Sequence, residues 1–382
     1  MNQPMNSREK VEQLLSEDPE SCRLRERTAF DELARPGGEL ILFGAGGLGK
    51  KLLRALRQDG IEPVAFIDNS LAGRVVEGVS VLTPSEAAQR WGSTATFVVS
   101  IWASWADTMR EQVQSLRDLG CETVISFIPL LWKYPAILPH VQIDLPSHIC
   151  EQKNKVLSAF NLWSDDASRE EFVSQLRWRL YADFSALHPA VPGQYWQRDL
   201  IDPGQQAVYV DCGACDGDTL EQFISFTGGR FREAFLFEPD DRNFRALQQR
   251  LNAMPESIRQ RIQAFPCAVA EADYNVSFSG GAGASSAAGT GSETVHCLSL
   301  DGTVSIPPTL IKYDIEGFEL LGLEGSRRII AEIAPSLVVC AYHTQSHIWE
   351  IPLLIDSIRK GYRYYLRPHG QIWETVCYAI PG

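Results

Sequence analysis

The sequence predicts an α/β protein with two three-layer domains, each built on a mostly parallel sheet with helices on both faces. Two observations lead to this prediction. Short apolar runs alternate with amphipathic stretches, and each half of the chain has a glycine-rich turn after an apolar run. The length of 382 residues agrees with it, because one hydrophobic core rarely serves so long a chain.

The composition is that of a globular protein, with 45% hydrophobic and 22% charged residues. A formal net charge of -13 argues against a nucleic-acid partner, since proteins that follow a phosphate backbone present a basic stripe. No apolar run is long enough to span a membrane, and the first residues lack the apolar core of a signal peptide. We therefore expect a cytoplasmic protein with no membrane span.

The first predicted domain covers residues 38–130 and follows a helical segment at 1–37. Apolar runs predict its strands, and amphipathic stretches predict the helices between them. The strands are expected at 39–43, 63–67, 96–101 and 123–127, and the helices at 50–59 and 106–118.

A glycine pattern lies between the first strand and the first helix of this domain. The segment Gly44-Ala45-Gly46-Gly47-Leu48-Gly49 matches Gly-x-Gly-x-x-Gly, which in Rossmann-like domains lets a phosphate approach a helix N-terminus. Asp68 follows the second strand, near the place expected of a ribose-binding carboxylate. Gly44, Gly46, Gly49 and Asp68 are therefore the candidate nucleotide site. The alternative is a domain kept for packing or for a homodimer.

Residues 131–204 are predicted to be a helical linker, and residues 205–382 form the second domain. Its strands are expected at 208–211, 235–237, 262–269, 309–313, 336–341, 362–366 and 375–380, and its helices from 218 and at 240–252, 318–330 and 349–360. The last two strands follow each other directly, so they predict an antiparallel hairpin at the sheet edge. A run of small residues at 280–291 is either a hairpin tip or a flap over a substrate.

The first strand of the second domain ends at Asp211, and the chain then turns on Gly213 and Gly217 into a helix. A turn without Cβ atoms admits a ligand close to the backbone, and Glu238, after the next strand, can accept both hydroxyls of a ribose. Acidic residues in the turn would repel a pyrophosphate but suit the ammonium and sulfonium of S-adenosylmethionine. The alternative is a strand–turn–helix without a ligand. Cys215 lies on this turn, in a C-x-x-C that nothing completes into a zinc site.

Four segments resemble the FkbM family of methyltransferases over residues 205–381: Ile311-Lys312-Tyr313-Asp314-Ile315-Glu316-Gly317-Phe318-Glu319, Ala341-Tyr342-His343, Trp349-Glu350-Ile351-Pro352 and Glu374-Thr375-Val376-Cys377-Tyr378-Ala379. The resemblance implies a class I methyltransferase sheet, S-adenosylmethionine as donor, and O-methylation of a sugar, glycan or natural product. It also implies which residues bind the cofactor. They are Asp211, Gly213 and Gly217 at the methionine moiety, Cys215 on the same turn, Glu238 at the ribose and Val269 at the adenine.

Methyl transfer to oxygen needs a positioned acceptor and a base. Asp314 and Glu316 follow one strand, His343 follows the next, and ligands bind at the carboxyl ends of such strands. All three are candidate catalytic residues, and a divalent cation held by them is the second interpretation. Lys312 is expected to pair with a carboxylate.

Residues 38–130 are also similar to the nucleotide-sugar-binding domain that precedes bacterial sugar acyltransferases. This similarity implies a nucleotide-linked acceptor. The rival functions are an NAD-binding oxidoreductase and a non-catalytic nucleotide-sugar-binding protein. The oxidoreductase is less favoured because no Tyr-x-x-x-Lys follows in the first domain.

Overall fold

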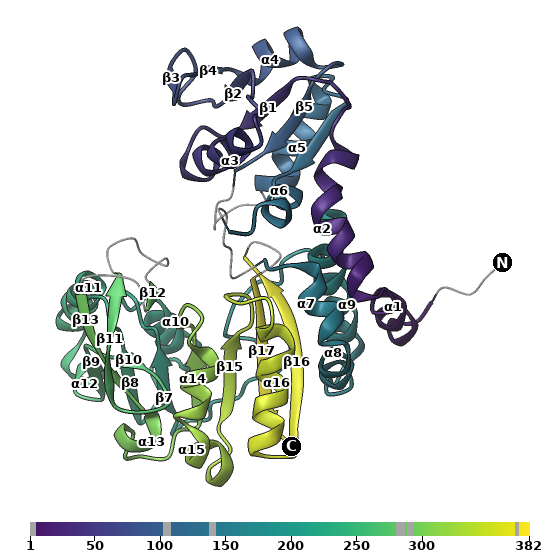
Figure 1. The fold of residues 1–382 in the computed structure, drawn as a ribbon. Helices are drawn as coiled ribbons and strands as arrows, with labels where there is room; N and C mark the ends of the chain where they lie inside the picture. Colours follow the sequence, from purple (N-terminus) through teal and green to yellow (C-terminus); the bar gives the residue numbers. More distant parts are fainter. Residues whose placement is uncertain (1–4, 102–107, 137–142, 280–286, 289–292, 371–373) are drawn as a thin grey trace. The chain divides into compact units, whose positions relative to one another are not determined.

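The computed structural model describes residues 5–101, 108–136, 143–279, 287–288, 293–370 and 374–382 (Figure 1). The chain divides into two compact units. The first contains the residues up to Lys153 and Val173–Pro189, and the second contains Asn154–Phe172, Ala190–His369 and Glu374–Gly382. Each unit has its own buried apolar core. No helix of the described residues is long and apolar enough to cross a membrane.

The first unit contains a sheet in the order β3-β4-β2-β1-β5-β6, in which only β3 runs antiparallel to its neighbour. Its strands are β1 (Leu40–Phe43), β2 (Ala65–Ile67), β3 (Val75–Val76), β4 (Val79–Leu82), β5 (Thr96–Val99) and β6 (Thr123–Ser126). Every residue of β1, β2 and β5 is buried, as expected of parallel strands covered on both faces. The sequence prediction of four strands is confirmed, and it missed β3 and β4.

Helices precede, connect and follow these strands. They are α1 (Ser7–Leu14), α2 (Pro19–Leu33), α3 (Gly47–Gln58), α4 (Pro84–Trp91), α5 (Thr108–Asp118), α6 (Ile128–Lys133), α7 (Pro146–Glu151) and the 3-10 turn η1 (Phe184–Ala186). Capping side chains define where several of these helices begin. The Asp18 carboxylate accepts from two backbone N–H groups of α2, and Thr83 forms a capping box with Glu86. A disulfide between Cys22 and Cys150 joins α2 to α7.

The second unit contains a seven-stranded sheet in the order β16-β17-β15-β14-β7-β8-β9. Its strands are β7 (Val208–Cys212), β8 (Glu233–Phe237), β9 (Ile262–Phe265), β14 (Leu310–Tyr313), β15 (Ser336–Cys340), β16 (Tyr362–His369) and β17 (Glu374–Pro381). Only β17 runs against the others, inserted between β15 and β16. The predicted α/β class and the antiparallel hairpin at the sheet edge are confirmed.

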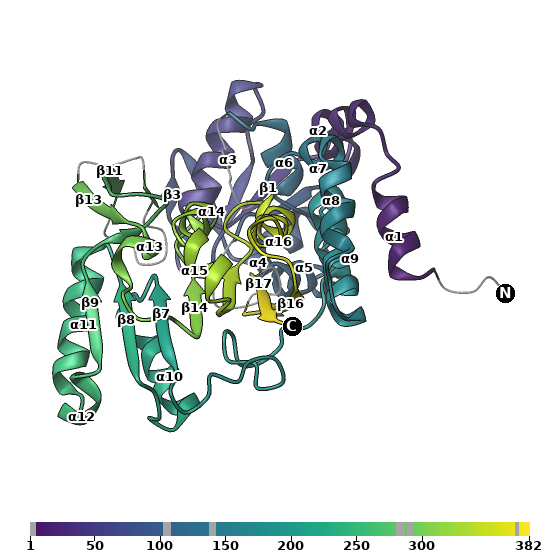
Figure 2. The same ribbon diagram turned by 90° about the horizontal axis from the view of Figure 1, so that it is seen from below.

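The other helices follow along the chain from residue 153. They are α8 (Lys153–Phe160), α9 (Asp166–Tyr181), α10 (Asp218–Thr227), α11 (Asp241–Ala253), α12 (Glu256–Arg259), α13 (Leu300–Thr303), α14 (Glu319–Glu324), α15 (Arg327–Glu332) and α16 (His347–Ile358). The division between the units runs through α8 and α9. Helix α11 lies beside β8 and β9, and α14 and α15 lie beside β14 (Figure 2). The predicted helix at 318–330 is therefore two short helices.

A small second sheet has the order β10-β13-β11-β12. Its strands are β10 (Ala268–Val269), β11 (Tyr274–Ser279), β12 (Ala287–Ala288) and β13 (Glu293–Leu298). The prediction of one strand over 262–269 is wrong, because the chain leaves the main sheet after Phe265. Pro266 has no N–H with which to continue a ladder. Of the small-residue run at 280–291, only β12 lies within the described residues.

Candidate active site

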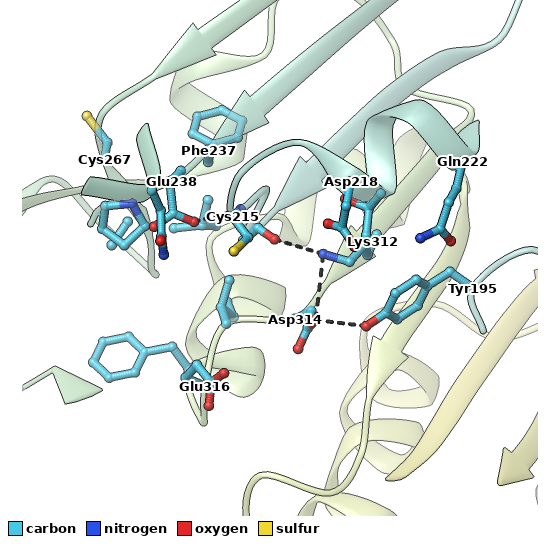
Figure 3. Close-up of a pocket in the computed structure, with 18 of the residues that line it drawn as sticks. Tyr195, Cys215, Asp218, Gln222, Phe237, Glu238, Cys267, Lys312, Asp314 and Glu316 are labelled. Carbon is cyan, nitrogen blue, oxygen red and sulfur yellow. Dashed lines mark hydrogen bonds and ion pairs between the residues drawn. The ribbon is translucent and has the colours of Figure 1, made fainter. Parts of the chain in front are cut away.

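A cavity of about 310 Å³ lies in the second unit, beyond the carboxyl ends of β7, β8 and β14 (Figure 3). Six of the predicted site residues line it. They are Gly213, Cys215, Glu238, Val269, Asp314 and Glu316. The other three predicted site residues are Asp211, Gly217 and His343. They do not line the cavity but lie beside residues that do.

The turn after β7 requires glycine at both predicted positions. Gly213 has φ +88°, and a Cβ there would lie 1.9 Å from the Asp314 carbonyl oxygen. Gly217 has φ +90°, and a Cβ there would lie 2.8 Å from Leu247. A side chain at Gly213 would therefore separate β7 from β14 at the floor of the cavity.

Glu238 follows β8 and is buried at one side of the cavity. One carboxylate oxygen accepts from the Cys215 backbone N–H at 2.8 Å, and the other accepts from the Asp240 backbone N–H at 2.9 Å. Burial raises the pKa of Glu238, although these donors oppose the shift. Each oxygen keeps a second lone pair, so the fixed carboxylate can still accept from two hydroxyls.

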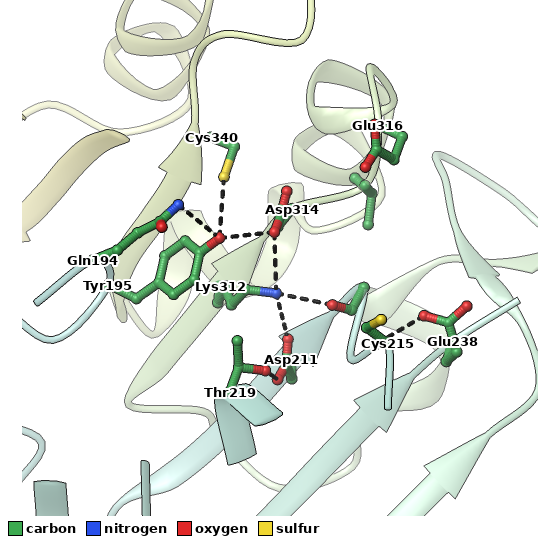
Figure 4. A network of polar contacts seen from close by, with 12 residues as sticks. Gln194, Tyr195, Asp211, Cys215, Thr219, Glu238, Lys312, Asp314, Glu316 and Cys340 are labelled. Carbon is green, nitrogen blue, oxygen red and sulfur yellow. Dashed lines mark hydrogen bonds and ion pairs between the residues drawn. The ribbon is translucent and has the colours of Figure 1, made fainter. Parts of the chain in front are cut away.

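Lys312 is a buried cation at the centre of a polar network (Figure 4). Its Nζ lies 2.8 Å from Asp211 Oδ1, 2.9 Å from the Gly213 carbonyl oxygen and 3.8 Å from Asp314 Oδ2. Burial alone would lower the pKa of Lys312, but the two carboxylates outweigh burial and raise it. The predicted pairing with a carboxylate is confirmed, and it ties the ends of β7 and β14 together.

The structure brings Asp314, Glu316 and His343 together. His343 Nε2 lies 3.5 Å from Asp314 Oδ1 and 3.6 Å from Glu316 Oε2. Its Nδ1 lies 2.7 Å from Glu319 Oε1. Burial would lower the pKa of His343, but these carboxylates, Glu319 first, raise it to about 9. At neutral pH His343 is therefore an imidazolium.

Glu319 is a fully buried carboxylate whose role the sequence did not predict. It also accepts from the backbone N–H groups of Ile315 at 2.9 Å and Gly317 at 3.1 Å, so it clamps the loop that carries Glu316. Burial would raise its pKa, but His343 and His347 hold it far below the usual range. Burial raises the pKa of Glu316 to about 7, and His343 opposes this shift.

We expect His343 to make stability depend on pH. Its pKa rises from 6.5 to about 9 on folding, so its contribution is complete below about 6.5 and is lost as pH rises through about 9. The melting temperature of the wild-type protein should fall across this window, and that of His343→Gln should fall less. His296→Gln, at an exposed position on β13, is the control. Equal pH slopes for wild type and His343→Gln would contradict the assignment.

Metal ligation finds no support in the described residues, where no group of three His, Cys, Asp or Glu side chains is arranged to hold an ion. Cys212 and Cys215 are free thiols. Cys212 is buried in β7 and Cys215 is exposed.

A separate cavity of about 350 Å³ lies in the first unit. Gly44, Gly46 and Asp68 line it, whereas Gly49 does not. A Cβ at Gly49 would lie 1.8 Å from the Gly44 carbonyl oxygen, so this glycine serves close packing. One Asp68 oxygen accepts from the backbone N–H groups of Ser70 and Leu71, and the other accepts from that of Ala45.

Comparison with known protein families gives one match, in the part of the second unit that contains Lys312 and most of the cavity lining. Residues 211–364 match the methyltransferase FkbM domain. The matched residues include Asp211, Glu238, Lys312, Asp314, Glu316 and His343. No curated protein matches the chain.

The crystal structure of methyltransferase FkbM from Methylobacillus flagellatus KT is similar to this chain, with a TM-score of 0.74 and 23% identity. The match covers 94% of this chain and 93% of that one, and at this identity it shows the fold alone. An rRNA methylase from Streptococcus thermophilus gives a TM-score of 0.30 and 14% identity over 48% of this chain and 91% of its own. Precorrin-6y C5,15-methyltransferase from Geobacter metallireducens GS-15 gives 0.30 and 11% over 46% and 81%.

Proposed function

We propose that the FkbM domain transfers a methyl group from S-adenosylmethionine to a hydroxyl of a sugar, glycan or other small molecule. The observation that carries this proposal is one cavity with a fixed carboxylate after β8 and two more after β14. The first, Glu238, suits a ribose. The other two, Asp314 and Glu316, suit an acceptor hydroxyl.

The lining of the cavity fits this donor. Its acidic members are Asp218, Glu238, Asp314 and Glu316, and its cation, Lys312, is held by Asp211. An acidic lining favours a ligand with a positive charge over a pyrophosphate. Phe237 and Val269 supply apolar surface for an adenine, beside Glu238.

S-adenosylmethionine supplies a methyl group on a positively charged sulfur. The residues of this chain bind the donor, orient the acceptor and accept the proton of the acceptor hydroxyl. Asp314 accepts the proton of the hydroxyl, and Glu316, whose pKa of about 7 also suits proton transfer near neutral pH, is the alternative acceptor. His343 already holds its proton, so its role is to keep both carboxylates in place. Incubation with radiolabelled donor and a panel of monosaccharides and UDP- or GDP-linked sugars tests the transfer, and a panel without any methylated product would count against a sugar acceptor.

Glu238→Ala should weaken S-adenosylmethionine binding at least several-fold. The carboxylate is the proposed partner of two ribose hydroxyls, and hydrogen bonds to a charged group contribute about 1–3 kcal/mol. Titration calorimetry measures the change. Glu233→Ala, at the other end of β8, is the matched control and should bind normally. Unchanged affinity in the Glu238 variant would remove Glu238 from the donor site.

The first unit is the second candidate binding site, for a nucleotide or a nucleotide-linked acceptor. Its support is the cavity that Gly44, Gly46 and Asp68 line at the start of α3. An NAD-binding oxidoreductase would use the same cavity. Calorimetry with UDP-sugars and with NAD separates the two functions, and a protein that binds neither would have a structural first domain.

Gly46→Val gives a direct test of this cavity. A Cβ at Gly46 meets no atom within 4 Å, so the added side chain starts in open space beside the cavity, where it would obstruct a ligand. We expect nucleotide binding to fall at least about 10-fold, with S-adenosylmethionine binding unchanged. A loss of donor affinity would instead indicate misfolding, and unaltered nucleotide binding would exclude the turn from the site.

A further inference from the structure

Tyr195 reaches the cavity from a segment that precedes the matched residues 211–364. It is 7% exposed and has φ +68°, in the left-handed region. A bulky residue is strained in this conformation and persists there only where its surroundings fix it. Cys215 and Glu316, which line the same cavity, also have positive φ. Three of the six non-glycine residues with positive φ in the described part of the chain thus line this cavity.

The neighbours of Tyr195 hold its strained backbone. Trp196 packs against Tyr209, Phe223 and Phe226 with ring centroids 5.5–5.6 Å apart. Its indole N–H donates to Gln222 at 3.0 Å. This packing anchors the segment on β7 and α10 and leaves the Tyr195 ring directed at the cavity (Figure 4).

The Tyr195 hydroxyl donates to Asp314 Oδ2 at 2.8 Å and accepts from Gln194 Nε2 at 3.0 Å. Burial and the Asp314 carboxylate raise the pKa of Tyr195 well above its ordinary value, so the hydroxyl keeps the proton that it donates. Lys312 Nζ lies 5.2 Å from the ring centroid and 3.8 Å from the same Asp314 oxygen. Oδ2 is therefore held by two groups. Oδ1 lies 3.5 Å from His343 Nε2, at the outer limit of a hydrogen bond, so it can still accept from an acceptor hydroxyl.

We propose that Tyr195 is a positioning residue that fixes one oxygen of Asp314 so that the other faces the acceptor hydroxyl at the methyl group. This inference rests on the proposed function, since it assigns Asp314 to the reacting end of the cavity. It adds to the methyltransferase site a residue from outside the matched domain.

The test needs no knowledge of the acceptor. Sinefungin carries an amine in place of the methylsulfonium of the donor, and S-adenosylhomocysteine carries neither. A carboxylate placed at the methyl position therefore favours sinefungin, and the ratio of the two affinities reports its placement. Tyr195→Phe removes only the hydroxyl. We expect this variant to lower the ratio at least about 5-fold, with S-adenosylhomocysteine binding within about 2-fold of wild type.

Two further variants complete the experiment. Asp314→Asn should lower the ratio at least as much as Tyr195→Phe, and the double variant should lower it no further than Asp314→Asn, because Tyr195 acts through Asp314. Tyr274→Phe is the matched control. Tyr274 lies on β11 of the small sheet, and its hydroxyl donates to Glu271 at 3.2 Å. Loss of this hydroxyl should leave the ratio of the two affinities unchanged.

An unchanged ratio in Asp314→Asn would overturn the proposed place of Asp314 in the reaction, and the role of Tyr195 with it. A lowered ratio in Asp314→Asn with an unchanged ratio in Tyr195→Phe would overturn the role of Tyr195 alone. Equal losses of both affinities in Tyr195→Phe, or additive effects in the double variant, would make Tyr195 a packing residue only.

Discussion

Asp314→Asn is expected to lower the rate of methyl transfer at least about 100-fold, the usual contribution of a positioned base. The amide keeps the size of the side chain and can still accept from Tyr195, but it cannot take a proton from the acceptor. Donor affinity should fall much less than the rate, because Glu238 holds the proposed ribose site independently. The measurement is single-turnover transfer of a radiolabelled methyl group to the acceptor that the sugar panel identifies.

Two further variants show which carboxylate is the base and whether the loss of rate is specific to the cavity. Glu316→Gln tests the other carboxylate, and a larger loss there than in Asp314→Asn would transfer the role of base to Glu316. Asp301→Asn is the matched control, since Asp301 accepts from the backbone N–H groups of Arg328 and Ile329, away from the cavity lining. Full turnover in both cavity variants would remove the carboxylate pair from the mechanism.

The sequence predicts the strand ends well, because the apolar runs stop where the chain reaches polar residues. Asp211, Glu238 and Asp314 each follow such a run, and parallel strands bring these ends to one edge of the sheet. The need for glycine at position 213 is also visible in the sequence. Its cause is not visible, since the clash would be with Asp314, about a hundred residues further along.

The parts that the sequence missed depend on contacts between distant residues. Tyr195 and Asp314 are 119 positions apart, and no local pattern relates them. Glu319 has the form of an ordinary acidic residue in the first turn of a helix, and only the fold surrounds it with two histidines. His343 fits a base by its ordinary pKa, and burial beside three carboxylates changes its protonation state.

The networks that support the cavity also explain why Asp211 and Lys312 are both buried and charged. Asp211 accepts from Lys312 and from Thr219 Oγ1 at 2.6 Å, so its two oxygens both have donors. Asp211 is fully buried and is not among the residues that line the cavity. We infer that the ion pair with Asp211 fixes Lys312 in place. The Lys312 ammonium then places a positive charge beside the Asp314 carboxylate.

Lys312→Met should therefore destabilise the second unit by about 3–5 kcal/mol, the cost of leaving one member of a buried ion pair without its partner. Urea denaturation measures the free energy of unfolding. Lys360→Met is the matched control: Lys360 pairs with Asp356 at the surface, and an exposed pair contributes about 0–1 kcal/mol. The double variant Lys312→Met, Asp211→Asn should recover part of the loss, because the carboxylate that lacks a partner is gone. A loss below about 1 kcal/mol in Lys312→Met would show that Asp211 does not depend on Lys312.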